Sequence, residues 1–400
     1  MRASSIDIHR NAKWSQNGIT VAGGNGHGSK TNQLHWPWGL YVDDDLTIYV
    51  ADYGNHRIVE WKSGATNGKV VAGGNGEGNG AHQLNCPLDV IIDKESDCLI
   101  ISDWQNKRVV RWPRRNGTRG ETIISNISCI GLTVDDNGYP YVVDDEKHEV
   151  RRYKIGDTKG TVVAGGNGEG NRLDQLTGPH YVFVDRDHSV YVSDFGNDRV
   201  MKWEEGAIQG IVVAGGQGQG NSLTQLDCPQ GVVVDQLGTV YVIDDENHRI
   251  MRWPKGATQG SVIVGGNAEG AQSNQLSYPI GLSFDRHGNL YVVDWGNHRV
   301  QKFNIVDTRL LLIRENYDII LYDAQQKRSL TSIRKSNILL ETNLHAKLIL
   351  PPCPRSQQEL KQTRRVLNVC EKNPIDEHPL NYDEYNPFNI CAASNVPHLS

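Results

Sequence analysis

The chain has 400 residues, which is enough for two or three average domains or for one large all-β domain with a tail. It carries 41 Lys and Arg against 47 Asp and Glu, and this net charge of −6 argues against bulk attraction to nucleic acid or to an anionic membrane. No apolar run reaches the ~20 residues that a membrane-spanning helix needs, and residues 1–14 lack the apolar centre of a secretory signal. All 42 glycines and all nine tryptophans precede residue 304, so composition divides the chain into two parts.

The seven cysteines show no CxxC and no mixed Cys/His spacing of the kind that indicates zinc. A disulfide framework is not expected in a chain of this size, and an odd count leaves at least one thiol free in a monomer. We therefore expect reduced, mostly structural cysteines, no metal and no cofactor. The compartment stays open, with the cytoplasm favoured.

A repeated phrase dominates residues 12–303. Tyr49-Val-Ala-Asp-Tyr-Gly-Asn-His-Arg-Ile-Val-Glu-Trp61 has six copies, and the aspartates at its fourth place are separated by steps of 51, 41, 50, 50 and 50 residues. These motif aspartates are Asp52, Asp103, Asp144, Asp194, Asp244 and Asp294. The short step falls in the third unit, which lacks the Gly-Gly-Asn-Gly spacer between Ile123 and Gly131. We expect this deletion to remove a connection and to leave the strands intact.

Each period predicts four short antiparallel strands. In the first unit, β-rich runs are separated by turn residues, and no helical period occurs. Six equal four-stranded units predict an all-β fold, a six-bladed β-propeller. The sixth unit stops after its third strand at Phe303, whereas residues 18–24 read as a fourth strand placed before the first unit. We expect this N-terminal strand to complete the sixth blade and close the ring, with Trp14 outside the blade.

The motif resembles that of the NHL-repeat family, whose units carry an Asp, an Asn-His-[Arg/Leu] and an apolar strand. It is complete as Asp52…Asn55-His56-Arg57, and also in the units of Asp244 and Asp294. It is weaker in the units of Asp103 and Asp194. It is degenerate in the third unit, which reads Asp144…Lys147-His148-Glu149. The resemblance covers about three quarters of the chain and implies the propeller fold. It leaves the function open, because propellers of this kind have many unrelated functions.

We interpret the charged motif residues as structural, because a residue repeated in every blade is expected to stabilise a feature that all blades share. Each aspartate is expected to accept hydrogen bonds from its turn and to pair with an arginine. The motif arginines are Arg57, Arg108, Arg199, Arg249 and Arg299. The turn asparagine is expected to adopt the left-handed conformation. The Gly-rich stretches lack the Lys-Ser/Thr and the helix of a phosphate loop, so we interpret them as connections between blades.

Function is expected where the repeats differ, on one face of the ring. The residue after the motif aspartate is aromatic in four units, as Tyr53, Trp104, Phe195 and Trp295. These four predict an aromatic rim that contacts a partner. The alternative is that each ring only caps the end of its own blade. Residues that follow a proline should crowd the mouth of the central channel on this face, among them Trp38, His180 and Gln230.

We expect a non-catalytic, monomeric scaffold that binds a protein partner on this face. By analogy with family members in ubiquitin ligases it would select a substrate, although no RING-type zinc framework is present. RNA is disfavoured by the net charge, and no membrane partner is expected. The alternative is a metal-dependent lyase or hydrolase at the channel, where His180 is well placed but a convergent set of ligands is missing.

We treat residues 1–11 as an N-terminal extension and residues 304–400 as a poorly structured, non-repeat tail. The tail has two apolar patches and a Pro351-Pro-Cys-Pro354 breaker, and nothing in it resembles a further propeller repeat. Weak order, folding on a partner, and sequence foreign to the protein all remain open.

Overall fold

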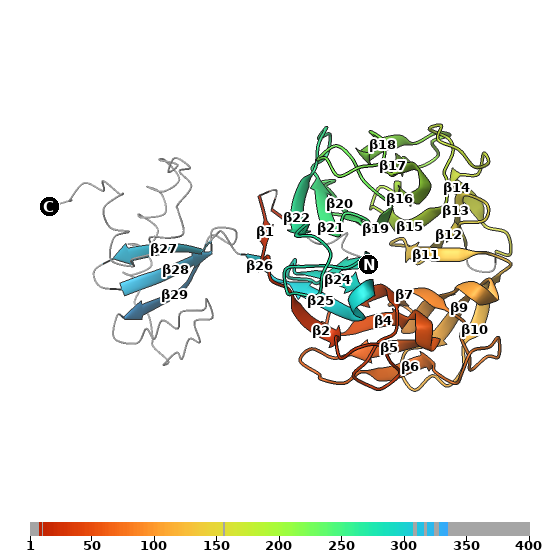
Figure 1. Ribbon diagram of the computed structural model, residues 1–400, viewed down its shortest axis with the longest axis horizontal. Coiled ribbons are helices and arrows are strands. Elements are labelled where there is room, and N and C mark those ends of the chain that lie inside the picture. Colours follow the sequence, from red (N-terminus) through yellow and green to blue (C-terminus); the bar gives the residue numbers. More distant parts are fainter. Residues whose placement is uncertain are drawn as a thin grey trace. The chain divides into compact units, whose positions relative to one another are not determined.

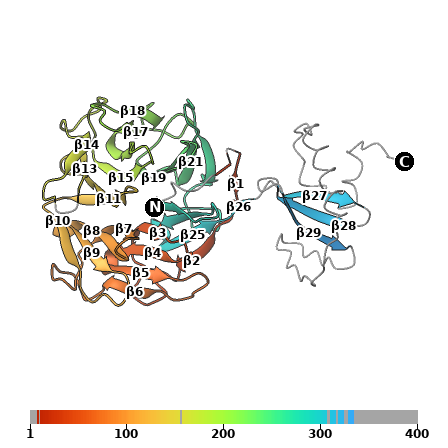
Figure 2. The same cartoon turned by 180° about the vertical axis from the view of Figure 1, so that it is seen from behind.

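The computed structural model describes residues 8–9, 11–154, 157–306, 310–315, 318–323 and 328–334, with side chains described up to residue 306. Its main feature is six four-stranded antiparallel sheets arranged in a ring (Figures 1 and 2). In blades 1 to 5 the strands follow chain order, and in blade 4 they step outward from β15 to β18 (Figure 1), whereas blade 6 takes its fourth strand from the N-terminus. The predicted six-bladed propeller is confirmed.

Blades 1 to 3 are formed by β3 (Pro37–Val42), β4 (Ile48–Asp52), β5 (Arg57–Trp61) and β6 (Lys69–Gly73); by β7 (Pro87–Asp93), β8 (Cys98–Asp103), β9 (Arg108–Pro113) and β10 (Glu121–Ser125); and by β11 (Cys129–Val134), β12 (Pro140–Asp144), β13 (Glu149–Arg152) and β14 (Thr161–Gly165). Blades 4 to 6 are formed by β15 (Pro179–Val184), β16 (Val190–Asp194), β17 (Arg199–Trp203) and β18 (Ile211–Gly215); by β19 (Pro229–Val234), β20 (Val240–Asp244), β21 (Arg249–Trp253) and β22 (Ser261–Gly265); and by β23 (Pro279–Phe284), β24 (Leu290–Asp294), β25 (Arg299–Phe303) and β2 (Ile19–Gly23).

The ring is closed by the N-terminal strand, as predicted. Strand β2 pairs antiparallel with β25, so one blade holds both ends of the repeat region and no open edge remains between them. Trp14 lies outside this sheet in β1 (Lys13–Trp14), which pairs with β26 (Ile305–Val306). The Trp14 indole is buried at 2% exposure, packs edge-on against Tyr241, and donates its Nε1–H to the carbonyl of Gly288 at 2.9 Å.

The third unit keeps all four strands although its step is short. Only residues 126–128 connect β10 to β11, and the sheet order β11-β12-β13-β14 is intact. The deletion therefore removed a connection, as the spacing predicted.

The core lies between the blades and is built from alternating strand residues. The third strands end in large buried rings, of which Trp61, Trp112, Trp203 and Trp253 are each at most 2% exposed. Turns between the first and second strands are fixed by an aspartate whose Oδ1 accepts two backbone N–H groups, as Asp43 does from Asp45 and Thr47 at 2.9 and 2.8 Å. We call the side of the ring that carries these turns the opposite face.

We call the other side the loop face. It carries the connections between blades and the turns between the second and third strands of each blade. Four of these turns are 3₁₀ helices: η1 (Tyr53–Asn55), η2 (Trp104–Asn106), η3 (Phe195–Asn197) and η4 (Trp295–Asn297).

Beyond the propeller, β27 (Leu310–Glu315), β28 (Asp318–Asp323) and β29 (Arg328–Arg334) form a separate three-stranded sheet in that order. The prediction of a poorly structured tail otherwise concerns residues outside the described part. Among the described residues no helix is long and apolar enough to cross a membrane.

Candidate functional site

In five blades the motif aspartate ties the blade to the connection that enters it. Asp294 is fully buried and accepts the Ser277 backbone N–H at 2.7 Å and the Arg299 Nε–H at 2.6 Å. Arg299 then donates to the carbonyls of Ala271 and Gln272 in the preceding Gly-rich connection at 2.9 and 3.0 Å. The same pairing, with Nε–Oδ2 distances of 2.6–2.7 Å, occurs in five blades: Asp52–Arg57, Asp103–Arg108, Asp194–Arg199, Asp244–Arg249 and Asp294–Arg299. In blade 3, Asp144 pairs with Lys147 at 2.7 Å instead.

The Gly-rich connections need glycine for a steric reason. Gly23 has φ +68°, and a Cβ there would lie 2.4 Å from the carbonyl oxygen of His298 in the same blade. The connections place an apolar anchor between blades, since Leu34, Leu84, Leu176, Leu226 and Leu276 are all fully buried.

The prediction that the turn asparagine is left-handed is wrong. Asn55 lies inside η1 and donates to Asp52 at 2.8 Å, whereas the next residue, His56, has φ +53°. A 3₁₀ turn needs a negative φ at the asparagine, so the left-handed residue is the next one, His56.

The side chain of the left-handed residue accepts a backbone N–H from the next blade. Nδ1 of His56, His148, His248 and His298 bonds the N–H of Cys86, Gly178, Tyr278 and Trp36 at 3.1–3.3 Å, and Oδ1 of Asp198 bonds that of Cys228 at 3.1 Å.

The four predicted rim aromatics each begin a 3₁₀ turn on the loop face and are half-buried. Among the described residues none of the four stacks on another of the four. Tyr53 packs against Trp38 with ring centroids 5.9 Å apart, and Phe195 stacks on His180 at 4.1 Å. Trp295 stacks on Trp36 at 6.0 Å. The structure therefore joins rim aromatics to residues of the connections and of the channel mouth, rather than to each other.

Sequence reasoning did not single out two large rings on this face, Trp36 and Tyr278, which lie beside the predicted Trp295. We define the aromatic cluster as Trp36, Tyr278 and Trp295, which span the junction of blades 6 and 1. Tyr278 meets Trp295 edge-on at 6.4 Å. Trp36 is 41% exposed and has φ +50°, and Tyr278 has φ +47°. Large residues rarely adopt this conformation, and the equivalent place in blade 4 is Gly178. The aromatic rings are thus held in a backbone shape that suits glycine.

Two of the predicted channel residues, His180 and Gln230, form a hydrogen-bonded chain with Asp245 across blades 4 and 5. His180 Nδ1 lies 2.9 Å from Gln230 Oε1, and Gln230 Nε2 donates to Asp245 Oδ2 at 3.2 Å. Burial lowers the pKa of His180 to about 4, although the Gln230 bond opposes this, so the imidazole is neutral at pH 7. Asp245 is 8% exposed, and its Oδ1 has no hydrogen-bond partner among the described residues.

Asp245 is the unusual acid of the site. Burial raises its pKa to about 7, and Glu246, Asp244 and Asp227 add to the effect, while the Gln230 bond opposes it. It titrates in the folded protein near neutrality, where an exposed carboxyl is fully ionised.

This shift makes stability depend on pH. Because the folded state binds the Asp245 proton more tightly than the unfolded state, stability falls as pH rises from about 4 to about 7 and then levels off. Asp245→Asn removes this loss, so we expect it to be more stable than wild type at pH 8 by about 4 kcal/mol, and this gain should shrink to about 1 kcal/mol at pH 4.5. Urea unfolding at both values measures the difference, and a gain of the same size at both would refute this origin.

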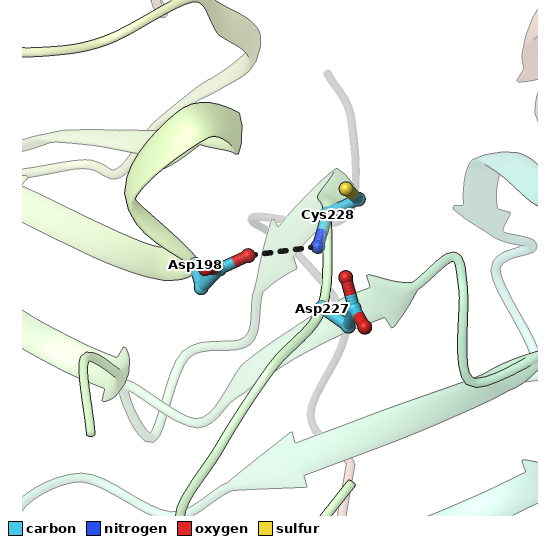
Figure 3. A group of neighbouring side chains, drawn as sticks. All are labelled: Asp198, Asp227 and Cys228. Atoms are coloured by element: carbon cyan, nitrogen blue, oxygen red, sulfur yellow. Dashed lines mark hydrogen bonds between the residues drawn. The ribbon is translucent and has the colours of Figure 1, made fainter. Parts of the chain in front are cut away.

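A candidate metal-binding group lies between blades 4 and 5 and is drawn in Figure 3. Ligand atoms of Asp198, Asp227 and Cys228 all lie within 4.8 Å of one another, and they are the only such group of three found among the described residues. Burial raises the pKa of the Cys228 thiol to about 12, and Asp198 already accepts the Cys228 N–H. His56 and Cys86 occupy the matching places between blades 1 and 2, so the group is a variant of the inter-blade contact.

The loop face over blades 4 to 6 is acidic. We define the acidic patch as Asp198, Asp227, Asp245, Glu246 and Glu269, which lie in turns and connections that contain no Lys or Arg. The nearby Arg199 and Arg249 are buried and paired with their motif aspartates. The patch reaches the aromatic cluster, since Glu269 accepts the hydroxyl of Ser277, the neighbour of Tyr278, at 2.9 Å, and His248 in the turn of Asp245 and Glu246 meets Tyr278 edge-on at 4.9 Å.

Similarity to known proteins agrees with this geometry. The NHL repeat profile matches residues 34–61, 226–252 and 276–303, which are the three units with a complete Asn-His-Arg motif. The chain is an NHL-repeat β-propeller. A second profile, which describes the C-terminus of the coatomer (COPI) alpha subunit, matches residues 330–399 of the tail, most of which lie outside the described part.

Solved structures similar to this NHL propeller share its fold at low identity. A protein of unknown function from Bacteroides thetaiotaomicron is 16% identical with a TM-score of 0.59, covering 74% of this chain and 77% of its own. An auxiliary nutrient binding protein from the same species is 15% identical with a TM-score of 0.58, covering 75% and 78%. A putative phosphatase from that species is 14% identical with a TM-score of 0.57, covering 76% and 81%. At such identities the likeness shows the fold alone.

Proposed function

We propose that this NHL propeller is a non-catalytic scaffold that binds a protein partner on its loop face. The observation that carries the proposal is the aromatic cluster, in which Trp36 is 41% exposed and Trp36 and Tyr278 both occupy a left-handed backbone. Neither burial nor turn geometry calls for a large ring there, because Gly178 fills the same place in blade 4. Trp and Tyr are the residues that most often dominate protein interfaces.

The predicted contact residues divide between two parts of this proposal. Trp295 belongs to the aromatic cluster, and Tyr53 with Trp38 lies in the same blade 1 as Trp36. Phe195, His180 and Gln230 lie at the channel mouth over blades 4 and 5. Trp104 begins η2 in blade 2. We propose the blade 6 and blade 1 side as the centre of the contact.

The alternative of a metal-dependent lyase or hydrolase at the channel has less support. His180 bonds Gln230 and stacks on Phe195, and Asp89 is fully buried and accepts the backbone N–H of Leu132 at 3.1 Å. These residues are thus bound to the fold rather than converging on a common point. Substrate selection in a ubiquitin-ligase assembly is one form the proposed binding takes, with the transferase supplied by another chain.

The test uses the tagged full chain as bait in native lysate. Trp36→Gly with Tyr278→Gly removes two rings while relaxing their left-handed backbone, so the fold is retained. The matched control, Cys86→Gly with Cys228→Gly, makes the same change at the equivalent places of blades 2 and 5. We expect the aromatic variant to recover at least tenfold less partner than wild type or control. Equal recovery by all three would contradict the proposal.

A further inference from the structure

We propose that the partner presents an arginine-containing segment to the loop face, with its guanidinium groups on the acidic patch and against the aromatic cluster. This inference rests on the proposed function and names the chemistry of the partner. Three features and their adjacency carry it: local charge, an unpartnered buried acceptor, and an aromatic surface.

Charge is the first feature. The chain has a net charge of only −6, yet the turns and connections of the acidic patch hold five carboxylates and no free cation. In other blades, cations of this face pair with carboxylates, as Lys107 does with Glu146 at 2.6 Å and Arg172 with Asp174 at 2.9 Å. A surface of one sign attracts a partner of the opposite sign and repels the phosphates of nucleic acid.

The unpartnered acceptor is the second feature. Asp245 is 8% exposed, and its Oδ2 accepts a bond from Gln230 while its Oδ1 has no partner among the described residues. A buried carboxylate oxygen without a donor is costly, so a side-chain rearrangement at the channel mouth that brings a partner N–H to it is favoured. This acceptor distinguishes the patch from a merely solvated acidic surface.

The aromatic surface decides between arginine and lysine. Trp36 and Trp295 stack with an interplanar angle of 15°, and Tyr278 meets Trp295 edge-on. A planar guanidinium stacks on such rings and presents five N–H donors to carboxylates, whereas an ammonium is a compact, strongly hydrated charge. Because Glu269 accepts the hydroxyl of Ser277, the residue next to Tyr278, at 2.9 Å, both kinds of contact are available to one segment.

The experiment measures the binding of three fluorescent peptides of equal length, rich in arginine, lysine or glutamate, to the full chain by anisotropy at low salt. We expect the arginine peptide to bind severalfold more tightly than the lysine peptide, and the glutamate peptide not to bind. Raising the salt should weaken arginine binding steadily.

Two variants of equal charge change locate the site. Asp227→Asn, Glu246→Gln and Glu269→Gln together neutralise the patch, and we expect them to weaken arginine binding about tenfold. Glu95→Gln, Asp136→Asn and Asp187→Asn remove three exposed carboxylates of the opposite face and should leave binding within about twofold. The Trp36→Gly, Tyr278→Gly variant should reduce the preference for arginine over lysine.

Equal effects of the two charge variants, or no binding of the arginine peptide, would overturn this inference. Tight calcium binding to the patch without peptide binding would overturn it as well. If the aromatic variant still lost its partner from lysate in any of these cases, the proposed function would stand with a partner of different chemistry.

Discussion

Replacing Asp294 by alanine is expected to lower the free energy of unfolding by about 3–5 kcal/mol. The carboxylate is fully buried and accepts bonds from the Ser277 N–H and from Arg299, so its loss leaves a guanidinium that is only 10% exposed without its counter-charge. The same change also frees the connection that enters blade 6. Urea unfolding of the full chain, followed by tryptophan fluorescence, measures the effect.

An ion pair of the same length but different burial provides the control. Lys94 Nζ lies 2.6 Å from Asp44 Oδ2, and the two side chains are 44% and 72% exposed. Solvent screens this pair, so Lys94→Ala should cost less than about 1 kcal/mol. Similar losses in the two variants would show that burial does not set the worth of the motif pair.

Removing residues 1–24 is expected to have a still larger effect, a loss of at least about 5 kcal/mol, which is much of the stability of a typical domain. The deletion takes away β2 and uncovers the backbone of β25 along its whole pairing edge. It also removes Trp14, whose buried ring packs on Tyr241 and Phe284. An open edge of this kind pairs with other chains, so the product should self-associate.

Thermal melting and light scattering measure this second prediction. A synthetic peptide of residues 12–26, added in excess, carries the missing strand and should restore a monomer with a higher melting temperature. If the shortened chain stayed monomeric and melted as the full chain does, the closure of the ring by β2 would not matter for stability.

The sequence was sufficient to predict the fold because each blade repeats the same solution. Six copies in register fixed the strands, and the absence of a fourth strand after Phe303 indicated the closure that β2 makes with β25. The left-handed residue was predicted at Asn55 but is His56, one position later. Turn composition alone gives no signal of the 3₁₀ turn that causes this shift.

The site was less predictable than the fold because it depends on contacts between units. The sequence comparison covered the residue after each motif aspartate and the residue after each proline, and Trp36 is neither. Its contact with Trp295 joins segments far apart in the chain. The acidic patch is hidden in a near-balanced total charge, since basic residues elsewhere in the chain offset its carboxylates in the sum. Comparing the place of Cys86, Gly178, Cys228 and Tyr278 across units was the signal that could have revealed Trp36.

Partner binding on the loop face is tested most directly by hydrogen exchange of the full chain, alone and with the partner that the wild-type bait captures. We predict slower exchange in residues 266–278 and 294–298, which carry Tyr278, Trp295 and Glu269. We also predict no change in the opposite-face turns at residues 43–47 and 135–139. Protection confined to those turns, with the loop face unchanged, would contradict partner binding on the loop face.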